Sequence, residues 1–92
     1  MTIHGKRLED DVFADDPFRP GSYGRVWVTV PEGHWAWYGC TPNGHACNLS
    51  AHEVIEHDDG TITVSPSILI TGGPNWEELW HGWLEHGKWR KC

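Results

Sequence analysis

The stretch that decides the fold runs from Asn75 to Trp89 and reads NWEELWHGWLEHGKW. It holds four of the chain's seven tryptophans, and two structures compete for it. At helical spacing, five apolar side chains form a single stripe: Trp76, Leu79, Trp80, Trp83 and Leu84. Asn75 and Glu78 would form a capping box at the start of such a helix, and Gly87 would end it.

Gly82 opposes the helix, because a glycine inside a helix costs about 1 kcal/mol relative to alanine. The alternative is one short helical turn near residue 75, followed by strands 80–84 and 88–92 joined at residues 85–87. Local pattern alone favours the helix.

The strand alternative makes a definite prediction about side chains, since neighbouring residues of a strand point to opposite faces. Trp80 and Leu84 would share a buried face. His81 and Trp83 would point outward together, where an imidazole and an indole could contact a partner.

Two hairpins are predicted upstream of this stretch. Residues 25–30 alternate between valines and the other side chains, and after a turn at residues 31–33 a second strand returns over 34–38. Residues 52–57 and 61–65 flank Asp-Asp-Gly in the same way. The fold class expected is therefore mostly β, a small antiparallel sheet or barrel-like domain of β-hairpins with one short helical turn near residue 75.

The first 22 residues differ from the rest, since they mix five acidic with three basic residues and hold few apolar ones. This composition predicts a polar, extended N-terminal arm over 1–22, with Val12, Phe13 and Phe18 docking on the domain or on a partner. Residues 23–92 would then form a single small β domain, because a chain of this length supports no more than one.

The charge is acidic, with 13 Asp and Glu against seven Lys and Arg, a net −6. Such a surface disfavours nucleic acid, because that binding depends on basic side chains neutralising phosphates. No apolar run is long enough to span a bilayer, so we expect no membrane association.

The cysteines and the histidines near them suggest a metal site. Cys40, His45, Cys47 and His52 follow a C-x4-H-x-C-x4-H spacing, and sulfur and imidazole suit tetrahedral zinc. The candidate ligand set is Cys40, His45 and Cys47 with His81 completing the shell, although structural zinc motifs usually begin with a tighter pair of cysteines. We expect no cofactor, with structural zinc as the alternative.

No motif indicates an enzyme. Ser50, Ser65 and Ser67 lie near histidines in sequence, but the nucleophile elbow G-x-S-x-G is absent.

The first use of the tryptophans in so small a chain is packing, and those that remain exposed indicate binding. Exposed apolar side chains usually mark interfaces, and four residues are the candidate contacts for another protein: Trp27, His81, Trp83 and Trp89. A glycan platform formed by Trp35, Trp37, Trp83 and Trp89 on one sheet face is the alternative.

The segments DGTITVSPSILI (59–70) and WHGWLEHGKWRKC (80–92) resemble a group of small bacteriophage proteins, mainly from actinobacteriophages. The segment over 41–60 is similar to their middle region, so the resemblance covers roughly residues 25–92. It implies a hairpin at residues 80–89, and we adopt that structure over the helix. Distant members look zinc-binding through C-x-x-C and Cys-His pairs, from which this chain departs at Cys40, Cys47 and Trp80.

The resemblance carries no activity of its own, and with the tryptophans as candidate contacts we expect a non-enzymatic phage accessory protein that binds another phage or host protein. It would be made in the host cytoplasm and carried in the virion as a head decoration or tail-associated component, through an oligomer or through assembly into the virion. The alternatives are an early acidic inhibitor of a host defence or other host protein, and a glycan-binding module.

Overall fold

Strands make up just over half of the described residues, and alternating apolar and polar side chains specify the longer ones. The computed structural model describes residues 2–16 and 18–92. Within them the elements are β1 (Thr2–His4), β2 (Lys6–Arg7), α1 (Val12–Asp15), β3 (Ser22–Val28), β4 (His34–Cys40), β5 (Ala46–Asn48), β6 (Glu53–Glu56), β7 (Ile62–Gly72), β8 (Glu77–Glu85) and β9 (Lys88–Lys91). The expected mostly-β fold class is confirmed.

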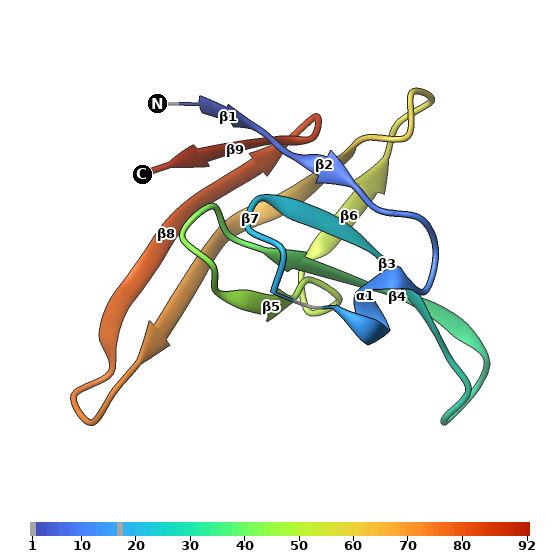
Figure 1. Ribbon diagram of the computed structural model, residues 1–92, viewed down its shortest axis with the longest axis horizontal. Helices are drawn as coiled ribbons and strands as arrows, with labels where there is room; N and C mark the ends of the chain where they lie inside the picture. The colour runs from blue at the N-terminus through green and yellow to red at the C-terminus, as the bar shows by residue number, and fades with distance from the viewer. Residues whose placement is uncertain (1, 17) are drawn as a thin grey trace.

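The strands form two sheets, which Figure 1 shows packed against each other without closing into a barrel. The five-stranded sheet has the order β1-β9-β8-β7-β6, and the four-stranded sheet has the order β2-β3-β4-β5. All neighbours are antiparallel except β2 and β3. Both upstream hairpins form as predicted, as β3–β4 and β6–β7.

The deciding stretch is a hairpin. β8 and β9 pair through a two-residue turn at His86 and Gly87, both with positive φ (47° and 74°), which is the geometry of a type I′ turn. The helical turn expected near residue 75 is not formed. Residues 73–76 make a turn between β7 and β8, in which Trp76 takes a left-handed φ of 54° that a right-handed helix excludes.

The N-terminal segment belongs to the domain, so the predicted boundary at residue 22 is wrong. β1 adds an edge strand to the five-stranded sheet, and β2 adds one to the four-stranded sheet. Leu8 and Phe13 are buried, whereas Phe18 is 67% exposed. This segment is polar in composition, yet it contains two short edge strands, β1 and β2, and two buried apolar side chains, Leu8 and Phe13. The described residues contain no helix long and apolar enough to cross a membrane.

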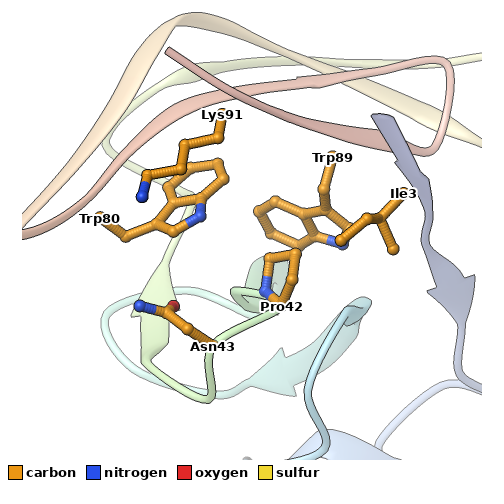
Figure 2. A pocket seen from close by; sticks show the side chains of 6 residues that line it. All are labelled: Ile3, Pro42, Asn43, Trp80, Trp89 and Lys91. Atoms are coloured by element: carbon orange, nitrogen blue, oxygen red, sulfur yellow. The ribbon is translucent and has the colours of Figure 1, made fainter. Parts of the chain in front are cut away.

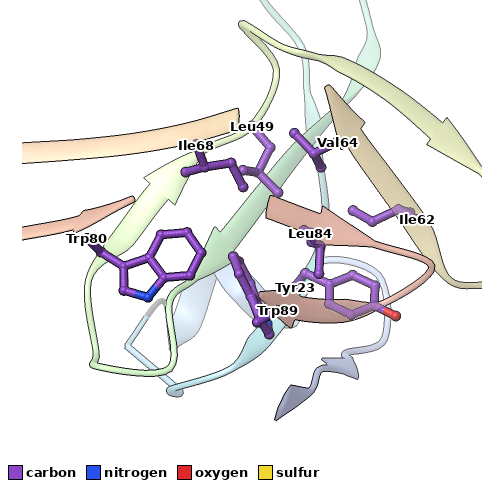
Figure 3. Close-up of a cluster of buried hydrophobic side chains, with 8 residues drawn as sticks. All are labelled: Tyr23, Leu49, Ile62, Val64, Ile68, Trp80, Leu84 and Trp89. Atoms are coloured by element: carbon purple, nitrogen blue, oxygen red, sulfur yellow. The ribbon is translucent and has the colours of Figure 1, made fainter. Parts of the chain in front are cut away.

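The larger core cluster joins the two sheets (Figure 3): Tyr23, Leu49, Ile62, Val64, Ile68, Trp80, Leu84 and Trp89. The indoles of Trp80 and Trp89 meet edge to face at 5.6 Å, and the Trp89 N–H donates to the Gly21 carbonyl at 2.8 Å. A smaller cluster of Leu8, Phe13 and Cys40 adds a second region of buried contacts. A single domain thus has two buried clusters, and the N-terminal segment contributes to the second.

Candidate binding surfaces

An exposed aromatic surface lies on the β3–β4 hairpin, and we name Trp27, Trp35 and Arg25 the hairpin patch. Alternation puts Arg25 and Trp27 on the same face of β3 as the core residue Tyr23. Figure 1 shows the loop end of this hairpin projecting beyond the other strands. On this face, side chains near the centre of the molecule are buried in the core, whereas those near the loop end reach solvent. Trp27 is 46% exposed.

The hairpin patch is held in a fixed arrangement. Trp27 and Trp35 are cross-strand partners and meet edge to face at 5.2 Å, while the Arg25 guanidinium lies 4.3 Å from the centre of the Trp35 ring. Asp10 accepts two hydrogen bonds from Arg25, at 2.8 and 3.0 Å. These bonds lower the pKa of the Asp10 carboxyl below its usual value. Arg25 is thus oriented before any partner arrives.

A second surface lies on the outer face of the five-stranded sheet. Trp80 and Leu84 are buried, and His81 and Trp83 point away from them, as the strand alternative predicts. The Arg90 guanidinium lies 4.3 Å from the Trp83 ring centre. Trp83 is therefore partly covered.

His81 stands between a hydroxyl and a carboxylate, in the order found in hydrolase triads. Its Nε2 lies 3.1 Å from the Ser67 Oγ, and its Nδ1 lies 3.4 Å from the Glu78 carboxylate. Glu78 is well exposed and its contact with the ring is longer than a hydrogen bond. An open sheet face of this kind leaves water at the reacting atoms, so the arrangement does not supply the enclosed site that acyl transfer needs. His81 bonded in this way is a surface residue of the sheet.

Trp89 is misplaced among the predicted partner contacts, because it is only 1% exposed and lies at the centre of the core. Trp27 and Trp83 lie on different sheets and do not form one surface. The four tryptophans of the predicted glycan platform do not share one sheet face either. Trp35 and Trp37 share a face of β4, but Trp83 lies on the other sheet and Trp89 is buried.

The predicted zinc ligands are not brought together. The register pairs Gly39 with Cys47 and Cys40 with Ala46, so Cys40 and Cys47 point to opposite faces of the four-stranded sheet. Cys40 packs with Leu8 and Phe13, whereas Cys47 packs against the larger core. Over residues 2–16 and 18–92 no group of three or more His, Cys, Asp or Glu is placed to hold a metal ion, so Cys40, His45, Cys47 and His81 form no site.

Thiol reactivity tests this arrangement. Burial raises the pKa of the Cys40 thiol, and it raises the pKa of the Cys47 thiol from 9.0 to about 11. A rise of that size lowers the reactive thiolate of Cys47 about 100-fold at neutral pH, whereas Cys92 is exposed. We expect Ellman's reagent to modify one thiol quickly and two only after unfolding in urea.

The control is Cys92→Ser, which should remove the fast phase. A fast phase from two or three thiols in the folded chain would contradict the burial of Cys40 and the partial burial of Cys47.

A pocket of about 270 Å³ opens beside the larger core (Figure 2). Its walls come from three separate parts of the chain: Ile3, Pro42, Asn43, Trp80, Trp89 and Lys91. Sequence reasoning missed it, because no local pattern brings β1, the β4–β5 loop and the C-terminal hairpin together.

Comparisons of the chain with protein-family models, with curated proteins and with solved structures found no match. The surfaces themselves are therefore the basis on which a function is argued.

Proposed function

We propose that this chain is a non-enzymatic bacteriophage accessory protein that binds another protein and is carried in the virion as a head decoration or tail-associated component. The observation that carries the protein-binding part is the hairpin patch. The phage context rests on the resemblance of residues 25–92 to small phage proteins.

The hairpin patch has the composition of a binding hot spot. Tryptophan and arginine are the residue types most enriched among the side chains that dominate protein–protein binding energies. Trp27 and Trp35 are partly exposed on a projecting hairpin, where a partner can reach them.

The hairpin patch is also pre-organised. Arg25 is fixed by Asp10, and the Trp27 backbone N–H donates to the Asp11 carboxylate at 2.9 Å. Binding to a surface already in its final arrangement loses less side-chain entropy, and this favours affinity. The segment that holds the hairpin patch is the same N-terminal segment that completes both sheets.

The second candidate is an acidic inhibitor of a host protein, which the net charge of −6 supports. In that version the carboxylates would face a basic cleft on the host protein, and the chain would remain outside the virion. The two versions share protein binding and differ in where the chain is found.

Mass spectrometry of purified virions separates them. We expect the chain in stoichiometric amounts relative to a structural protein of the virion, retained after a wash at about 1 M salt, because an aromatic contact is less screened than a surface ion pair. Absence from virions would contradict the virion component and leave the inhibitor. Binding on a glycan array that is lost in Trp35→Ala would contradict protein binding as the main activity.

A further inference from the structure

The pocket beside the larger core has the features of a site for a small ligand, separate from the hairpin patch. It lies where β1 and β9 face the β4–β5 loop, and its floor is formed by two tryptophans of the core. Ligand sites are typically apolar concavities with a few converging polar groups.

The apolar walls form a corner that fits one ring. Ile3 and Pro42 form the accessible sides of this corner, and the edges of the buried Trp80 and Trp89 rings, whose planes stand at 85° to each other, close its floor (Figure 2). At about 270 Å³ the pocket is just below the range of roughly 300–1,000 Å³ seen for drug-sized ligands. It therefore suits a ring-sized group and excludes a large cofactor.

Two of the polar groups in the walls are already used. The Asn43 side chain donates to the Leu79 carbonyl at 3.1 Å and accepts from the Thr41 hydroxyl. The Trp89 N–H donates to Gly21. Trp89 therefore has no donor left for a ligand, and Asn43 keeps only its second amide hydrogen.

Two other donors remain. Within residues 2–16 and 18–92, no carboxylate lies within 4.0 Å of the Lys91 ammonium. In the same part of the chain no acceptor bonds the Trp80 N–H, which is not sealed from solvent. Figure 2 shows the Trp80 nitrogen on the side of its ring that faces Trp89, while Lys91 extends across Trp80 and its ammonium ends on the opposite side of that ring. The flexible lysine side chain can turn to bring its charge to the same anion. A cation and a neutral donor at the edge of an apolar corner are complementary to an anion attached to a ring.

We propose that this pocket binds a small aromatic carboxylate, with its ring against Ile3 and Pro42 above the buried Trp80 and Trp89 side chains and its carboxylate accepting from Lys91 and from the Trp80 N–H. The same chemistry is presented by a free aromatic acid and by the C-terminal aromatic residue of a polypeptide. An amide or an amine of the same size lacks the charge that Lys91 recognises.

The experiment titrates 3-phenylpropionate into the full chain, followed by amide chemical shifts of the residues around the pocket. A ligand with about eleven non-hydrogen atoms is expected to bind with a dissociation constant of about 1 mM or tighter. 3-Phenylpropanamide should bind at least about tenfold more weakly, because it forfeits a charged hydrogen bond. N-acetyl-Gly-Gly-Phe with a free carboxylate distinguishes the sources: tighter binding than 3-phenylpropionate indicates a chain end, and weaker binding indicates a free acid.

Variants locate the site. Lys91→Gln should weaken 3-phenylpropionate binding about tenfold or more, whereas Lys88→Gln, on the same strand but outside this pocket, should leave it unchanged. Ile3→Trp should block binding by filling the pocket, and its spectrum reports whether the chain is folded. Equal binding of the acid and the amide, no response to the acid at about 10 mM, or an unchanged affinity in Lys91→Gln would each overturn the proposal.

Discussion

Removing residues 1–21 is expected to unfold the rest of the chain. The deletion removes the edge strands β1 and β2, the buried side chains of Leu8 and Phe13, and the Gly21 carbonyl that accepts from Trp89. Losing the two apolar side chains alone costs roughly 5–10 kcal/mol. That is comparable with the whole stability of a small domain, about 5–15 kcal/mol.

Circular dichroism melting of the chain 22–92 against the full chain measures this effect. Phe18→Ala is the matched control, because Phe18 belongs to the same segment but is exposed, and its melting temperature should stay near that of the unmodified chain. Cooperative melting of the chain 22–92 within about 5 °C of the full chain would mean that the segment is an arm after all.

Trp80→Ala is expected to destabilise the domain by about 3–5 kcal/mol. Trp80 is 4% exposed and meets Trp89 edge to face, so its removal leaves a cavity between the two sheets. For a domain of this size the loss corresponds to roughly 12–40 °C in melting temperature. Denaturant unfolding measures the difference directly.

Trp83→Ala is the control, because it removes the same side chain from the outer face of the same strand. Its cost should be clearly smaller, since Trp83 loses mainly its contact with Arg90. Equal destabilisation by both substitutions would contradict the alternation of β8 and favour a single buried stripe.

The hairpins were predictable because their signals are local. Residues 25–38 and 52–65 carry both alternation and turn residues, and each strand pairs with the one that follows it. The sequence predicted the face of the strand on which Trp27 lies, but not its exposure. Alternation placed it opposite the valines, but only the length of the hairpin relative to the other sheet shows that this end is uncovered.

Residues 75–89 show why one local pattern can mislead. The apolar residues of β8 sit at helical spacing, yet their faces are set by pairing with β7 and β9. Gly82 was the one local signal against the helix, and the structure shows why a glycine stands there. A Cβ at this position would lie 2.2 Å from the Arg90 carbonyl oxygen and 2.7 Å from the Trp80 ring, so a glycine is needed for the close approach of β9 and for Trp80 to fold over the strand.

Long-range pairing determined what the sequence could not show. β1 and β2 have three and two residues, too few for any periodicity, and they are specified by partners far along the chain. The cysteine spacing suggested a shared site, but the register of β4 against β5 turns Cys40 and Cys47 to opposite faces. Trp89 is buried in the core for a similar long-range reason, because the face of β9 on which it lies is turned toward the other sheet.

The hairpin patch is the central claim, and the copy number of variants in purified virions tests it most directly. The comparison uses the unmodified chain, the double variant Trp27→Ala/Trp35→Ala, and Trp76→Ala, which removes a tryptophan that is 76% exposed outside the hairpin patch. Each variant is first shown to be folded by circular dichroism. We expect Trp76→Ala to be incorporated as the unmodified chain is, and the double variant to fall about tenfold or more, because hot-spot residues each contribute roughly 2 kcal/mol or more. Incorporation of the folded double variant at the level of the unmodified chain would contradict the account.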